Sequence, residues 1–144
     1  MVKRSKRLDV VAELADRKVQ EAASALKESN EKLAQSQYSE NLLASSHRSH
    51  RDHIDERLAN GSSAYDLKVL SQSVTNLQKG LDQIAGRVRQ AEAERDACME
   101  VWTAQRAKSQ AIERAIQRRV DEETSYRQRQ DERAIDDTIS SRRR

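Results

Sequence analysis

The fold is decided by residues 67–91, which read LKVLSQSVTNLQKGLDQIAGRVRQA. Read in sevens, this stretch begins two columns of residues that continue to Tyr126. One column holds Leu67, Val74, Leu81, Val88, Arg95, Trp102, Ser109 and Ile116, and the other holds Leu70, Leu77, Ile84, Ala91, Cys98, Gln105, Ile112, Arg119 and Tyr126. The alternating spacing of three and four places both columns on one side of a helix. A strict period of seven predicts a left-handed supercoil with a partner helix.

A second heptad pattern precedes this stretch and predicts the partner helix. Its columns hold Ala12, Val19, Leu26 and Leu33, and Leu8, Ala15, Ala22 and Ser29. After Leu33 the same frame places Glu40 and His47 on the apolar face, which predicts a stutter near residues 36–43 or a local change of partner. The seam residues expected between the helices are Leu8, Ala15, Val19, Leu26, Leu33, Leu67, Leu70, Val74, Leu77, Leu81, Ile84, Val88, Trp102, Ile112 and Ile116.

One convincing break separates the two patterns, at residues 58–63. Gly61 suits the left-handed conformation that closes a helix, and Ser63 with Asp66 three places later is close to a capping box. Gly80 and Gly86 lie inside the second helix, where each costs about 1 kcal/mol relative to Ala and marks a close approach or a bend.

The predicted fold is therefore all-α, with two long helices in an antiparallel coiled-coil hairpin. We expect a single coiled-coil domain over residues 1–144, with helix one over about residues 6–58, the loop over 59–63, helix two over about 64–138, and frayed ends. At 1.5 Å per residue, helix two outruns helix one by roughly 25 residues, so its C-terminal part is expected to overhang.

Composition supports a rod over a globular domain. Charged residues make up 35% of the chain, aromatic residues 3%, and Phe is absent. Disorder is the competing interpretation of such a composition, but the sustained heptads oppose it for the central part. The 27 Lys and Arg nearly balance the 24 Asp and Glu, so the chain is not uniformly basic. No apolar run has the length of a membrane span, and no signal peptide pattern is present, which predicts an intracellular protein.

The sequence contains only weak candidates for metal binding or catalysis. His47, His50 and His53 are three residues apart, but successive steps of this size drift around a helix, and no Cys or closed ligand shell lies nearby. We therefore expect these three histidines to be solvated surface residues. We expect no metal, no cofactor and no enzymatic activity, because a two-helix rod offers no cleft that excludes water. Cys98 falls on the seam and is expected to be a small core residue, and Trp102 is expected either to fill the seam or to anchor a partner.

Two groups of residues, one near each end of the chain, have the order and spacing of a known family. The N-terminal group is Leu8-Asp9-Val10-Val11-Ala12-Glu13-Leu14-Ala15, Ala22-Ala23 and Leu26. The C-terminal group is Trp102, Arg106, Glu113, Arg118, Glu122, Gln130-Asp131-Glu132 and Asp136. With them, the chain resembles the FliJ family of flagellar export proteins over nearly its whole length, and that family turns where Asn60-Gly61 stand here.

The resemblance implies a component of the flagellar type III protein export apparatus, similar in fold to the central stalk of rotary ATP synthases. Such a protein binds the FliI-type export ATPase hexamer, promotes its assembly and activity, links it to the FlhA-type export gate and escorts export chaperones. It is expected to be monomeric when free, cytoplasmic, and peripherally associated with the inner membrane at the flagellar base, with a role in flagellum biogenesis and hence chemotaxis. The YscO-type stalks of non-flagellar secretion systems are related.

Two sets of contact residues follow as hypotheses. The overhanging helix, with the basic N-terminal segment behind it, would enter the ATPase ring through Arg118, Glu122, Arg127, Gln130, Asp131 and Asp136. The half nearer the loop would bind the export gate through Leu43, Ser46, His50, Ser73 and Leu77, where Ser and His stand at positions that are aromatic in the family.

Three alternatives stay open at this point. One is the stalk of a non-flagellar secretion system. A second is a self-associating coiled-coil scaffold, in which residues 67–91 pair with another copy. A third is a nucleic-acid-binding coiled coil that uses the basic ends, Lys3 to Arg7 and Arg142 to Arg144, although partner nucleic acid is not expected because charges of both signs alternate.

Overall fold

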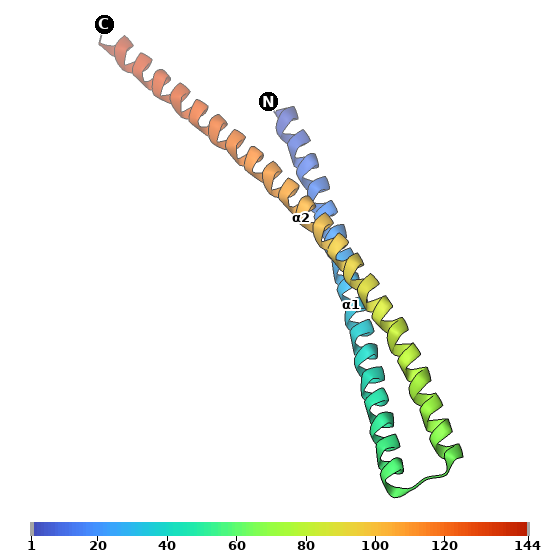
Figure 1. Cartoon of the computed structure of the whole chain (residues 1–144). Helices are drawn as coiled ribbons and strands as arrows, with labels where there is room; N and C mark the ends of the chain where they lie inside the picture. Colours follow the sequence, from blue (N-terminus) through green and yellow to red (C-terminus); the bar gives the residue numbers. More distant parts are fainter. Residues whose placement is uncertain (1, 144) are drawn as a thin grey trace. The chain divides into compact units, whose positions relative to one another are not determined.

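The computed structural model describes the backbone of residues 2–143 and the side chains of residues 7–143. It contains two helices, α1 (Val2–Asn60) and α2 (Ala64–Arg142), joined by residues 61–63 (Figure 1). Residues 2–143 contain no strand, which confirms the all-α prediction. Both helices are longer than predicted, since α1 begins at Val2 and α2 continues to Arg142. The absence of Pro and the high content of Ala, Leu, Gln, Glu and Arg favour such continuous helices.

The chain forms two compact units, and each unit contains one segment of each helix. The hairpin unit is Ala22–Val101, and the terminal unit is Met1–Glu21 with Trp102–Arg144. The sequence-based expectation of a single coiled-coil domain over 1–144 stays a prediction. Neither helix holds, within the described residues, a stretch both long and apolar enough to cross a bilayer.

The helices of the hairpin unit run antiparallel. Ser29 Oγ lies 3.2 Å from Cys98 Sγ, and nearer the loop Arg57 Nη1 lies 3.8 Å from an Asp66 carboxylate oxygen. A residue later in α1 therefore faces a residue earlier in α2. Between these points Leu33, Val88 and Ala91 form the buried cluster of the unit. The predicted coiled-coil hairpin is confirmed.

Side-chain burial follows one heptad frame along α1, without the predicted stutter. The residues with reduced exposure in this frame are Leu8, Ala12, Ala15, Val19, Ala22, Leu26, Ser29, Leu33, Ser36, Glu40, Leu43, His47, His50 and Ile54. Glu40 and His47 thus sit half-buried on the seam, while Leu42 and Leu58 are exposed. The stutter prediction was wrong because long polar side chains can cover a seam with their stems and keep their polar ends in water.

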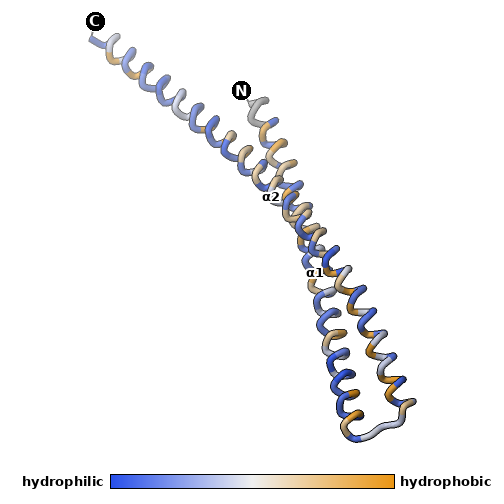
Figure 2. The backbone as a smooth tube through the Cα atoms, viewed as in Figure 1, coloured by the Kyte–Doolittle hydropathy of each residue, from blue (hydrophilic) through white to orange (hydrophobic). Residues whose placement is uncertain are grey.

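The seam of α2 ends earlier than its sequence columns. Residues with reduced exposure keep the 3-4 spacing from Leu67 to Ile116, but Arg119 and Tyr126 are exposed. Every side chain of residues 117–143 is exposed, and Figure 2 shows this last part of α2 as mostly hydrophilic. We call residues 117–143 the unpaired tail. The predicted overhang is therefore present within the terminal unit.

The loop uses the residues that the sequence singles out. Gly61 has φ of 78°, the left-handed conformation expected of it. Ser63 caps α2, because its Oγ accepts a hydrogen bond from the Asp66 amide at 3.2 Å and its carbonyl accepts one from Leu67 at 3.2 Å. The Asp66 carboxylate lies near Arg57, so only the serine half of the expected capping box is formed.

The three glycines have different structural environments, which gives a stability prediction. A methyl group on Gly86 would meet nothing within 4 Å, and one on Gly80 would make ordinary contact with Leu43 at 3.9 Å. Gly86→Ala and Gly80→Ala should each raise the free energy of unfolding by about 1 kcal/mol, since Ala is the better helix former. Gly61→Ala should lower it by about 1 kcal/mol, because an L-residue is strained at positive φ.

Urea denaturation followed by circular dichroism measures all three changes. Ala107→Gly, at an exposed position of α2, is the matched control and should cost about 1 kcal/mol. A destabilising Gly86→Ala would mean that another chain approaches the helix at this point.

The unpaired tail should also differ from the seam in hydrogen exchange. A single helix without a packed face is marginal in water, so its amides open locally without unfolding the rest. Amides of residues 120–142 should exchange orders of magnitude faster than those of residues 84–91, which surround the buried Val88. Equal protection of both regions in the purified chain would show that the tail is covered by another copy.

Candidate partner-binding surfaces

The unpaired tail carries many charges and pairs none of them internally. Residues 117–143 contain seven Arg and seven Asp or Glu, and none of these takes part in an ion pair among the described residues. Its polar side-chain contacts are local and include Gln117 to Asp121 at 2.9 Å and Gln130 to the Tyr126 hydroxyl at 2.7 Å. The charged groups of the tail are therefore free to meet a partner.

The six residues predicted to contact the ATPase all lie in this tail and are exposed. At 100° per residue, Arg118, Glu122 and Asp136 fall on one side of the helix, and Arg127 and Asp131 fall on nearly the opposite side. Gln130 lies between these two sides. Such residues cannot all meet one flat partner surface, but they can all meet a partner that surrounds the helix.

The predicted gate contacts lie in the hairpin unit, and most of them belong to the seam. Leu43, His50, Ser73 and Leu77 are half-buried, and Ser46 is exposed. His50 Nδ1 lies 2.8 Å from the Ser46 carbonyl oxygen, to which it donates as the Nδ1–H tautomer. Leu43 and Leu77 contribute to packing, so only part of each side chain is available to a partner.

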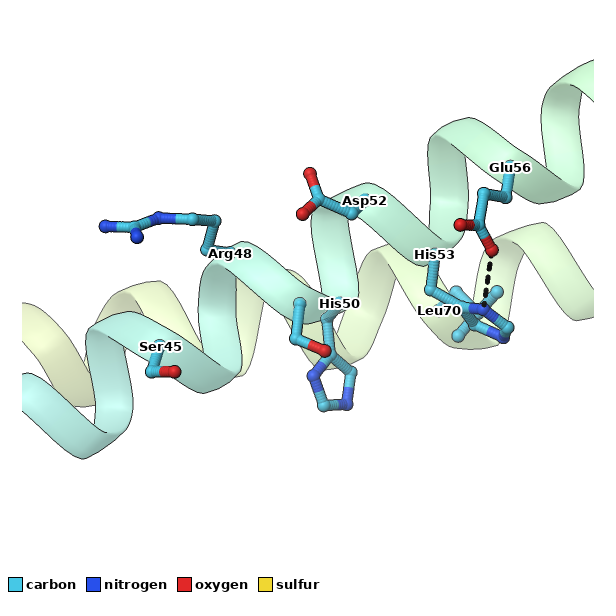
Figure 3. A pocket seen from close by; sticks show the side chains of 8 residues that line it. Ser45, Arg48, His50, Asp52, His53, Glu56 and Leu70 are labelled. Carbon is cyan, nitrogen blue, oxygen red and sulfur yellow. Dashed lines mark ion pairs between the residues drawn. The ribbon is translucent and has the colours of Figure 1, made fainter.

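A shallow groove lies beside these positions (Figure 3). Its lining residues are Ser45, Arg48, Ser49, His50, Asp52, His53, Glu56 and Leu70. Figure 3 shows the rings of His50 and His53 on the same side of α1, with His53 Nδ1 4.0 Å from Glu56. His47 is not among the lining residues; it sits on the seam. Among the residues whose side chains are described, no three His, Cys, Asp or Glu side chains converge on a possible metal position.

Two seam residues of the terminal unit make specific polar or aromatic contacts. Ser109 is buried, and its hydroxyl donates a hydrogen bond of 2.9 Å to the Asp16 carboxylate. Trp102 is half-buried, and the Arg106 guanidinium lies 5.1 Å from the centre of its ring. The heptad columns place Ser109 and Trp102 on the seam, but they give no sign of the Asp16 and Arg106 contacts, which come from residues outside the columns.

The geometry defines a class of protein: an antiparallel two-helix coiled coil whose second helix continues beyond its partner as an exposed, charged tail. The family model described as "Flagellar FliJ protein" matches residues 4–144. The chain therefore belongs to the FliJ family, and it is a component of the flagellar type III export apparatus. The same comparisons find no match to this chain among curated proteins or solved structures.

Proposed function

We propose that this chain is the stalk of the export ATPase: its unpaired tail enters the FliI-type hexamer and promotes assembly and activity of the ring. The single observation that carries the proposal is the tail itself, 27 residues (117–143) of exposed helix with balanced charges that form no internal ion pairs. A helix without a packed face is marginal in water, and a surrounding partner would supply the missing contacts.

Charges on opposite sides of the tail support insertion over side-on docking. Exposed ion pairs contribute only about 0–1 kcal/mol each, so many of them give a contact that holds the helix yet exchanges readily. We further propose that the hairpin unit binds the FlhA-type gate through the surface around Ser46 and His50. In this proposal the chain links the ATPase to the inner membrane and escorts empty export chaperones.

Truncation after Arg119 tests the tail. The deleted residues that the structure describes are exposed, so they do not contribute to the seam. The melting temperature of the truncated chain, measured by circular dichroism, should therefore be unchanged. Stimulation of the cognate ATPase should fall to the unstimulated rate, and the hexamer-sized complex should disappear from size-exclusion profiles. Full stimulation by the truncated chain would overturn the proposal.

Charge-swapped pairs distinguish insertion from docking on one face. Arg118→Glu with Glu122→Arg alters one side of the tail, and Arg127→Asp with Asp131→Arg alters the other, both at constant net charge. Insertion into a ring predicts that both swaps weaken stimulation several-fold. A loss confined to one swap would show that a single face of the tail docks.

Gate binding is tested with one exposed and two seam positions. Ser46→Glu should weaken binding to the gate linker without a change in melting, since Ser46 is exposed. Leu43→Ala and Leu77→Ala should also weaken it, at a cost of about 1 kcal/mol or more in stability, and should leave ATPase stimulation intact.

Leu26→Ala is the matched control for the two leucines. It lies half-buried on the same seam, outside the proposed gate surface. Equal loss of gate binding in Leu26→Ala would trace the effect to the stability of the hairpin and not to the gate surface.

A further inference from the structure

The terminal unit exposes an apolar patch that the seam does not use. Val10, Val11 and Leu14 are 55%, 46% and 51% exposed, although they lie within the paired part of α1. Val10 is two residues from both Leu8 and Ala12, so at 100° per residue it points about 160° away from these seam positions. Val10 and Leu14 therefore lie on the outer side of α1, where a solvated helix normally carries polar residues, and Val11 lies at the edge of that side.

The basic charge of the chain is concentrated in the paired segments of the terminal unit, to which α1 contributes +2 and α2 contributes +4. Residues 2–21 and 102–119 contain 11 Lys or Arg and 5 Asp or Glu, a net charge of +6. The remaining residues contain 16 Lys or Arg and 19 Asp or Glu, a net charge of −3. The overall net charge of +3 is therefore the sum of one basic part and a slightly acidic remainder.

The basic side chains of this part are available to an anionic partner. Those described, from Arg7 onward, are all exposed, and none takes part in an ion pair among the described residues. Arg7 precedes the apolar patch by one turn, and Arg17 and Lys18 follow it by one turn. At 100° per residue, these three basic side chains lie on the same side of α1 as Val10 and Leu14. Asp9, Glu13 and Asp16 turn away from that side, and Glu21 is the one acidic residue of 7–21 that shares it. An aliphatic patch with mostly basic neighbours on its own side fits a surface that is both apolar and negatively charged.

We propose that the outer face of α1 around Val10, Val11 and Leu14 docks on an anionic lipid bilayer. The aliphatic side chains would enter the boundary between headgroups and acyl chains, while Arg7, Arg17 and Lys18 meet lipid phosphates. Each Lys or Arg near an anionic membrane strengthens binding about fivefold. Three aliphatic side chains alone bind weakly, so the contact depends on both contributions and is reversible.

A bilayer fits these observations better than nucleic acid does. Nucleic-acid backbones are bound by basic side chains without a need for exposed aliphatic ones, and the patch has no aromatic residue for base stacking. The contact goes beyond the proposed stalk function. The N-terminal segment is expected to lie behind the tail in the ATPase ring. When the ring is absent, the bilayer would be a second partner for this segment.

Vesicle co-sedimentation of the full chain alone tests the proposal. Vesicles that contain phosphatidylglycerol should bind the chain at low salt, and vesicles of phosphatidylcholine alone should not. Added salt should release the chain, because screening shortens the range of the attraction. Leu14→Ser should weaken binding about fivefold, and Arg17→Gln with Lys18→Gln should weaken it roughly 25-fold.

Matched variants in the hairpin unit serve as controls. Leu42 is 52% exposed, like Leu14, and Leu42→Ser should leave binding unchanged. Arg87→Gln with Arg89→Gln removes the same charge from two other exposed positions and should have little effect. Circular dichroism melting should be the same for all these variants, since each changes exposed side chains only.

Three outcomes would overturn the proposal. The first is no sedimentation with phosphatidylglycerol vesicles at low salt. The second is an equal effect of the control variants, which would show non-specific attraction. The third is tighter binding to duplex DNA than to vesicles, with no effect of Leu14→Ser, which would assign the basic part to nucleic acid. The assay contains no ATPase, so failure of the stalk proposal would leave this result standing.

Discussion

The packing of two helices along a single 3-4 seam is the constraint on which the rest of the structure depends. A helix with one neighbour can shield only one side, and no described side chain with a large volume is fully buried. The most protected positions are small or branched, such as Ala15, Ala22, Val88 and Ala91. Stability is therefore spread over many shallow layers, and no single layer dominates.

The same constraint determines where function can reside. Once the seam has used one face of each helix, every other face is open to a partner, and beyond Ile116 the whole circumference of α2 is open. A protein of this kind has little capacity for a pocket, but it offers long surfaces. Its chemistry consequently depends on patterns of charge: unpaired charges of both signs on the tail, and three basic side chains on the same side of α1 as Val10 and Leu14.

The sequence predicts the helices, the turn and the overhang well, because each depends on local signals: the heptads after Leu67, Gly61, and the difference in helix length. It fails where a polar residue occupies an apolar column. His47 and Glu40 fit the seam through their side-chain stems, which a count of apolar residues misses. Conversely, the heptad column continues in the sequence to Tyr126, but α1 no longer packs against α2 there, so Tyr126 is exposed. The Asp16 and Arg106 contacts depend on side-chain reach, which heptad spacing does not encode.

The shallow seam also sets how the fold responds to temperature. The heat capacity of unfolding grows with the apolar area that becomes hydrated, and only six apolar residues of the described part of the chain are buried. The stability curve should therefore be flat, with an unfolding enthalpy that changes slowly with temperature. A broad thermal transition would be a property of the native two-helix packing, and not a sign that its structure is incomplete.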